Sequence, residues 1–119
     1  MQGFLDERRN AYLTIDFGQG PLDLIIDTGF DGSLCVGREL FDSTGLQLFG
    51  EMDTELAANQ SQRYDCYIVR FDWMIEETET LVMVGPGTDC LIGTALLEPH
   101  RLEIDYEKRS VELIRGSSW

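Results

Sequence analysis

Short apolar segments alternate along the chain with glycine-containing and acidic turns, and extended helical periodicity is rare. Short segments of alternating or continuous apolar residues, bounded by turn residues, are typical of β-strands. The pattern therefore predicts an all-β fold. The expected strands and hairpin arms are residues 11–17, 22–26, 33–36, 54–56, 64–73, 71–75, 81–84, 102–106 and 111–114.

The connections between these strands are predicted to be tight turns and one or two short helices. Residues 38–44 have the spacing of a short helix, which Gly45 would end. A second short helix is expected after Gly93, and Pro99 would curtail it. No linker divides the chain, so we expect residues 1–119 to form one domain. The expected turns are residues 18–21, 57–62, 76–77 and 107–109.

Charge and size limit what the protein can bind. The 119 residues include 22 acidic and 9 basic side chains, which gives a formal net charge of −13. Such a surface repels nucleic-acid phosphates and anionic lipids, so neither nucleic acid nor a membrane is an expected partner. A chain of this size builds one core and not two lobes, so an active site made of two halves would need a second chain.

Cysteine content and the N-terminus bear on location. Cys35, Cys66 and Cys90 are widely spaced and form no CxxC pair, so we expect free thiols in a reducing cytoplasm. Cys35 and Cys90 have apolar neighbours and no basic one, which favours small core residues over nucleophiles. No stretch of about 18 apolar residues and no long apolar segment at the N-terminus occurs. The sequence therefore predicts a cytoplasmic protein.

The segment with the strongest chemical character is Asp27-Thr28-Gly29, which directly follows the apolar residues 24–26. A strand that delivers a carboxylate onto a glycine turn puts an ionisable group where its surroundings can tune it for catalysis. Considered alone, the tripeptide is more simply an acidic turn whose carboxylate accepts hydrogen bonds from nearby amides. A second apolar pair followed by glycine, Leu91-Ile92-Gly93, repeats the arrangement. Two related halves of one lobe would produce such a repeat.

Three motifs make the sequence similar to the retropepsin-like aspartic proteases, and to their small bacterial members in particular. They are Asp-Thr-Gly-Phe-Asp-Gly at residues 27–32, Ile-Gly-x-x-Leu-Leu at 92–97 and His-Arg-Leu-x-Ile-Asp at 100–105. The resemblance covers nearly the whole chain. It implies a bacterial source and an all-β, single-lobe acid protease barrel that forms a homodimer. The implied function is that of an aspartic endopeptidase acting on peptides or unfolded protein segments.

The resemblance also implies a role for each residue of the first motif. Asp27 of each subunit would meet its twin, and the two carboxylates would share one proton and activate a water for peptide-bond hydrolysis. Thr28 would form a hydroxyl bond across the dimer, and Gly29 would allow close approach of the substrate. The implied substrate contacts are Phe30, Asp31, Gly32 and, at the hairpin tip, Ala58, Asn59 and Gln60. No metal or other cofactor is implied.

Two features differ from the retroviral members of the family. Phe30 stands where a small residue is usual, although it matches the small bacterial pattern, and it would narrow a side-chain subsite. The hairpin tip at residues 57–62 lacks the glycines that make retroviral flaps flexible. We therefore expect a stiffer tip that restricts the range of substrates.

Two other functional classes agree with the same residues. A non-catalytic dimerisation or peptide-binding module would keep the Asp27 turn as architecture. A monomeric small-molecule-binding β-barrel would need an apolar cavity and no dimer. The only histidine, His100, has no serine or cysteine partner in a motif and is expected to be a surface residue without a catalytic role. The acidic residues around Glu76 lack the spacing of a calcium loop.

Overall fold

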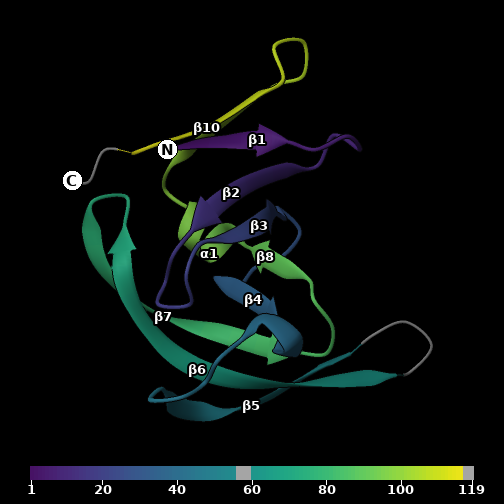
Figure 1. Ribbon diagram of the computed structural model, residues 1–119, viewed down its shortest axis with the longest axis vertical. Coiled ribbons are helices and arrows are strands. Elements are labelled where there is room, and N and C mark those ends of the chain that lie inside the picture. Colours follow the sequence, from purple (N-terminus) through teal and green to yellow (C-terminus); the bar gives the residue numbers. More distant parts are fainter. Residues whose placement is uncertain (56–59, 117–119) are drawn as a thin grey trace.

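In the computed structural model, which describes residues 1–55 (Glu55 by its backbone alone) and 60–116, the strands form one strongly curved sheet (Figure 1). The strand order is β5-β6-β7-β4-β8-β3-β2-β1-β10-β9. Within the described part of the chain, β5 and β9 each have a neighbour on one side only, so the sheet is open where a closed barrel was predicted. The elements are β1 (Gln2–Leu5), β2 (Ala11–Ile15), β3 (Leu22–Ile26), β4 (Leu34–Gly37), η1 (Arg38–Leu40), β5 (Gln47–Glu55), β6 (Ser61–Trp73), β7 (Glu76–Gly85), β8 (Cys90–Ile92), α1 (Thr94–Leu97), β9 (Arg101–Asp105) and β10 (Ser110–Ile114).

The all-β prediction is confirmed, and the first predicted hairpin follows the sequence pattern closely. In β2, Ala11, Leu13 and Ile15 are buried, as strict alternation requires, and the strand pairs antiparallel with β3. The strand ends at Ile15 and not at residue 17. The turn that follows contains Gly18 and Gly20 with φ of 104° and 78°, a conformation that glycine adopts without a steric penalty.

Two connections differ from the prediction. The chain reverses between β6 and β7 at Met74 and Ile75, both in the left-handed region with φ of 51° and 66°, and the predicted acidic turn at residues 76–77 is part of β7. Two-residue hairpin turns usually have glycine or asparagine at these positions, so Met-Ile gave no turn signal. The helix predicted over 38–44 is one 3-10 turn, Arg38–Leu40, which buries no residue. A longer helix would have no packing to sustain it.

Two further strands differ from the prediction: β1 was not predicted, and β5 is longer than predicted. β1 has no predicted counterpart, because its four residues are too few to show a period, yet it pairs with both β2 and β10. β5 begins at Gln47 and not at residue 54, and it pairs with β6 along its whole length around a bulge between Leu48 and Gly50. The hairpin β5–β6 is therefore much longer than the predicted arms.

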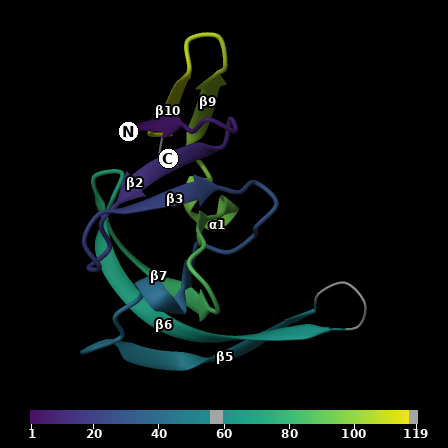
Figure 2. The same cartoon turned by 45° about the vertical axis from the view of Figure 1, so that its right-hand side comes forward.

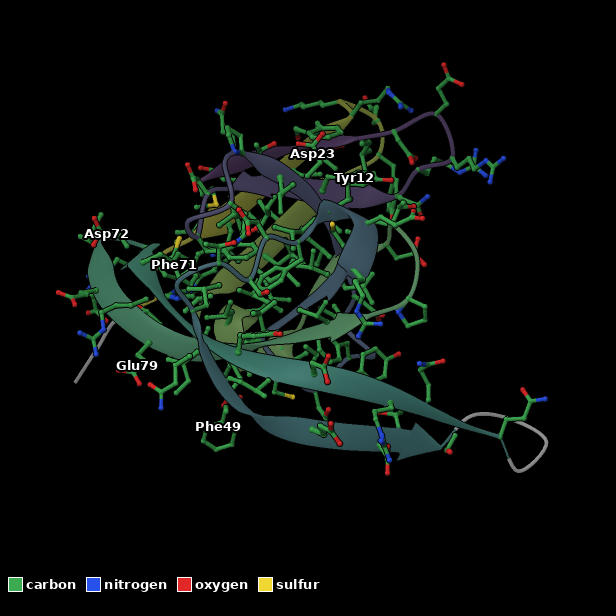
Figure 3. The ribbon with its side chains drawn as sticks, turned by 60° about the horizontal axis from the view of Figure 1, so that its bottom comes forward. Tyr12, Asp23, Phe49, Phe71, Asp72 and Glu79 are labelled. Atoms are coloured by element: carbon green, nitrogen blue, oxygen red, sulfur yellow. The ribbon has the colours of Figure 1, made fainter. Side chains whose placement is uncertain are left out.

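The main core lies inside the curve of the sheet. β6 contributes Val69, Phe71 and Trp73 to it, while alternate residues of the same strand face outward. Figure 3 shows this alternation in β6, where Phe71 points into the interior and Asp72 points away from it; Glu79 of the neighbouring strand β7 also points away. Helix α1 adds Leu96 and Leu97. The fully buried side chains are Leu13, Leu24, Leu34, Ile92, Leu113, Val36, Val69 and Val82.

No helix of residues 1–55 and 60–116 has the length and apolar character needed to cross a bilayer.

Helix α1 is attached to the sheet by a side-chain hydrogen bond. Helix α1 has only four residues, too few to be stable alone, so its position depends on tertiary contacts. The Nε1 of Trp73 donates a buried hydrogen bond of 3.0 Å to the backbone carbonyl of Leu96, which ties α1 to β6.

The substitution Trp73→Phe tests this connection. It removes the indole donor, leaves the carbonyl of Leu96 without that partner and shrinks a side chain that is 4% exposed. We expect the free energy of unfolding to fall by about 2–3 kcal/mol, measured by urea denaturation. Tyr106→Phe, at a 60% exposed position, is the control and should change it by less than about 0.5 kcal/mol. Equal effects of the two substitutions would contradict this account of α1.

Candidate active site

The parallel pairing of β3 with β8 places Asp27 directly after the end of β3. Ile25 lies opposite Leu91, and Ile26 lies opposite Ile92. The pairing continues one step further, because the backbone N–H of Asp27 donates to the carbonyl of Ile92 at 3.0 Å. Asp27 and Gly93 therefore leave neighbouring strands at the same level, one into each of the two similar turns found in the sequence.

Gly93 locks the two turns together. Its N–H donates to the carbonyl of Ser33 at 2.9 Å, and the N–H of Thr94 donates to the carbonyl of Phe30 at 2.8 Å. A β-carbon at Gly93 would collide with the carbonyl oxygen of Gly32 and come within 2.6 Å of the carbonyl oxygen of Phe30. Glycine is required here because the other turn passes directly over it.

The Asp27 carboxylate is oriented by its own turn. Its Oδ1 accepts a hydrogen bond of 2.9 Å from the N–H of Gly29, while its backbone carbonyl accepts one of 3.1 Å from the N–H of Phe30. The bond to Gly29 engages one carboxylate oxygen and leaves Oδ2 for another partner. Asp27 is half-buried, and Thr28 and Gly29 are exposed. The carboxylate is thus fixed by the backbone at an accessible position.

A cleft of about 360 Å³ opens beside this carboxylate. Its floor is a row of side chains across adjacent strands, in which Cys35 of β4 lies between Leu91 of β8 and Met83 of β7. The Asp27 turn forms one wall and the hairpin β5–β6 forms the other. The lining residues are Asp27, Gly29, Phe30, Asp31, Cys35, Met52, Thr54, Tyr64, Met83 and Leu91.

The other ionisable groups of the cleft favour carboxylate chemistry. Burial raises the pKa of the Cys35 thiol to about 11, with Cys90 and Asp89 adding to the effect, so the thiol is not a nucleophile at neutral pH. Burial also raises the pKa of the Tyr64 phenol, which therefore stays neutral. Asp27 and Asp31 are the acidic residues that line the cleft. General acid–base chemistry in it would have to use a carboxylate.

The structure brings together some of the predicted site residues. Asp27, Gly29, Phe30 and Asp31 all line the cleft, and exposed Thr28 lies between them in the chain. The remaining predicted contacts are placed differently. Gly32 lies under the Phe30 ring, where a β-carbon would be 2.5 Å from Cζ, and Gln60 is an exposed residue before β6 that does not line the cleft. Ala58 and Asn59 lie outside the described residues.

Sequence reasoning missed most of the cleft floor and part of the hairpin wall. Met52 was missed because the pattern placed the start of the hairpin arm at residue 54, whereas β5 begins at Gln47. Met83 and Leu91 look like ordinary core residues in the sequence, and only the strand register shows that they share a face with Cys35. Cys35 was expected in the core and is instead half-buried at the cleft, whereas Cys90 is in the core as predicted.

The contacts of His100 stabilise the fold and do not involve the cleft. Its Nδ1 accepts a hydrogen bond of 3.0 Å from the N–H of Gly116, and its ring packs edge-on against Trp73 with 6.2 Å between ring centroids. It does not line the cleft. Burial lowers the pKa of the His100 imidazole, which suits a neutral acceptor.

Comparison with solved structures relates this fold to proteins of known chemistry. The crystal structure of a retropepsin-like aspartic protease from Rickettsia conorii matches with a TM-score of 0.58 and 19% identity, over 93% of this chain and 95% of that one. The foamy viral protease-reverse transcriptase in complex with an RNA/DNA hybrid matches with a TM-score of 0.54 and 18% identity, over 86% of this chain and 13% of that one. A scan against protein-family models and a search of curated proteins give no match.

At these identities the likeness establishes the architecture. The chain has the retropepsin-like fold, as the sequence motifs predicted. Asp27 lies at the end of β3, on the turn that the resemblance singled out, and it faces a cleft.

The substitution Gly93→Ala tests the junction of the two turns. The new methyl group would displace the backbone of Gly32 and Phe30, so we expect the free energy of unfolding to fall by about 3 kcal/mol in urea denaturation. Gly50→Ala is the matched control, because a β-carbon there meets no atom within 4 Å. It should leave stability unchanged or raise it by about 0.5–1 kcal/mol. A Gly93→Ala protein as stable as the Gly50→Ala protein would refute the close approach.

Proposed function

We propose that the protein is an aspartic endopeptidase that acts as a homodimer. The observation that carries the proposal is the Asp27 carboxylate, held by its own turn and accessible in a cleft, in a retropepsin-like fold. The second turn, Ile92-Gly93-Thr94, has no carboxylate that could serve as its partner. In this proposal Asp27 of a second subunit supplies the second catalytic carboxylate, and Asp31 contacts the substrate.

The chemistry follows from bringing two carboxylates together. Two such groups about 3 Å apart share one proton, because both cannot ionise at that distance. The ionised Asp27 takes a proton from a water that attacks the peptide carbonyl carbon, and the protonated Asp27 donates a hydrogen bond to the developing oxyanion. The C–N bond then breaks as the leaving amine receives the proton that the ionised Asp27 took from the water, so the pair again holds one shared proton. Water and peptide are the only reactants.

The neighbouring residues have matching roles in this proposal. Thr28, which is exposed, bonds to the partner subunit and fixes the two turns against each other. Gly29 lets the substrate backbone approach Asp27, and the exposed carboxylate of Asp31 accepts a hydrogen bond from a substrate amide. Gly32 makes room for the Phe30 ring. Substrate contacts by Ala58, Asn59 and Gln60 stay part of the proposal, as the sequence motifs imply.

The lining of the cleft points to the kind of substrate. Phe30, Met52, Tyr64 and Met83 present apolar surface, so an apolar side chain next to the scissile bond would bury most area. A cleft of about 360 Å³ per subunit accepts an extended segment rather than a folded protein. We therefore propose peptides or unfolded protein segments as substrates, and the cytoplasm of a bacterium as the setting.

The substitution Asp27→Asn tests the proposed reaction. It keeps the side-chain oxygen that accepts the Gly29 N–H and removes the shared proton, so kcat/KM on a broad peptide library should fall by about 10³-fold or more while the protein stays folded. The matched control is Asp16→Asn. Asp16 also accepts an i+2 N–H, from Gly18 at 2.9 Å, but lies outside the cleft, so cleavage should be unchanged.

The pH profile provides an independent reading of the same reaction. A carboxylate pair that shares one proton is active only between its two macroscopic ionisations, so kcat/KM should be bell-shaped within about pH 3 to 7. The absence of Asp27-dependent turnover by the wild-type protein across that range would refute the proposed endopeptidase activity. The non-catalytic peptide-binding module would then be the better interpretation.

A further inference from the structure

The outer face of β6 and β7 carries apolar residues beyond the cleft. Val69 and its alternate neighbours on β6 face the main core, so the residues between them face outward. Among these, Ile68 of β6 lies opposite Leu81 of β7, and neither belongs to a hydrophobic cluster of the fold. They share the outer face with Tyr64 and Met83, which line the cleft. Apolar surface therefore continues along the two strands from the cleft.

A second hollow, of about 220 Å³, opens on this continuation. We call it the outer hollow, and its lining residues are Phe49, Ile68, Glu79, Thr80 and Leu81. Phe49 is 65% exposed, and Figure 3 shows Phe49 and Glu79 on the outer side of the sheet. The hollow is smaller than the roughly 300 Å³ at which small-molecule sites begin. It therefore fits one side chain of a longer chain better than a separate ligand.

The charges at the outer hollow favour an apolar occupant. Glu79 is the only charged residue among those that line it, and its carboxylate lies 2.6 Å from the guanidinium of Arg70. A cationic side chain would have to compete with Arg70 for this carboxylate. An apolar side chain would instead cover the exposed ring of Phe49, and an aromatic ring removes a large apolar area from water when it is covered.

The strand geometry gives the distance between the outer hollow and the cleft. Leu81 is two residues from Met83, and Ile68 is four residues from Tyr64, which correspond to about 7 Å and about 13 Å along a strand. Between the two hollows, Gly50 lies opposite Cys66, and a β-carbon at Gly50 would meet no atom within 4 Å. No side chain of β5 therefore blocks the path at this position. An extended peptide beside β6 would reach the outer hollow with about four residues.

We propose that the outer hollow is a second substrate subsite, which binds an apolar side chain about four residues away from the apolar side chain held in the cleft. The inference rests on the proposed function for the peptide in the cleft, and it adds a further part of that peptide which the protein recognises. The occupant is the same peptide because the two hollows lie on one continuous face. The preferred substrates are then unfolded segments with two apolar residues at this spacing.

The test compares peptides that differ only outside the cleft. The short peptide that is cleaved best is extended on each side with serines, and phenylalanine replaces each added serine in turn. At one position, about four residues from the apolar residue in the cleft, phenylalanine should lower KM about 10-fold relative to the all-serine peptide. The kcat should stay the same, because a contact made equally in the ground state and the transition state changes KM alone.

The substitution Phe49→Ser assigns this preference to the outer hollow. It removes the exposed ring, so the ratio of the two KM values should fall from about 10 to about 1. Ile75→Ser is the matched control, because Ile75 is an 85% exposed apolar residue at the β6–β7 turn that lines neither hollow. It should keep the wild-type ratio. A wild-type ratio of about 1, or a ratio that Phe49→Ser leaves unchanged, would overturn the proposal.

Binding of the same peptides to the Asp27→Asn variant, followed by fluorescence anisotropy, separates the subsite from the protease. Dissociation constants in the expected ratio, without cleavage by the wild-type protein, would support the subsite and reject the protease. Cleavage without the ratio would reject the subsite and support the protease. Absence of both binding and cleavage would reject both. If Phe49→Ser changes the oligomeric state and leaves the ratio unchanged, a second copy covers the outer hollow and the proposal is wrong.

Discussion

The short parallel contact between β3 and β8 is the constraint on which the candidate site depends. The hydrogen bond from the Asp27 N–H to the Ile92 carbonyl extends this contact beyond the strands, and the absence of a side chain at Gly93 lets the following turn close over it. β4 pairs with the other side of β8, so the three strands hold each other at the centre of the sheet. Backbone hydrogen bonds from Gly93 to Ser33 and from Thr94 to Phe30 join the two turns. These bonds hold the Asp27 carboxylate in a fixed position relative to the core.

The floor of the cleft is apolar because it is formed by the face of β4 and β7 that points away from the core. Along β4 and β7, alternate residues point into the core, and the residues between them, Cys35 and Met83, form the cleft floor. The sheet is thus one layer thick between the packed interior and the surface where a peptide would lie. An apolar floor beside a backbone-fixed carboxylate agrees with the proposed acid pair, because a bound peptide that displaces water from such a floor would strengthen the electrostatic effects of the pair.

The sequence predicted the parts that depend on local patterns. Alternating and continuous apolar residues identified β2 and β3, and the repeated glycine turns singled out Asp27 and Gly93. It could not predict the turn at Met74 and Ile75, where tertiary pairing of long strands imposes positive φ on residues that rarely adopt it.

Long-range features were beyond the reach of pattern reading for a related reason. β1 is recognisable only through its partners, and the cleft floor follows from register between strands that are far apart in the sequence. The hairpin wall was foreseen in part, because Tyr64 and Thr54 fell within the predicted arms and Met52 did not. Residues whose role is set by which strand lies beside them carry no local mark of that role.

Because β6 is long, the residues that stabilise the fold and the residues that border the cleft lie at opposite ends of it. The strand runs from Tyr64 at the cleft to Trp73 beside helix α1, about nine residues apart and so roughly 30 Å in extended chain. One end holds the fold together, and the other end borders the cleft. Substitutions at the cleft end are distant from the packing around Trp73, which gives evolution, or an engineer, a region in which peptide preference can change at little cost in folding stability.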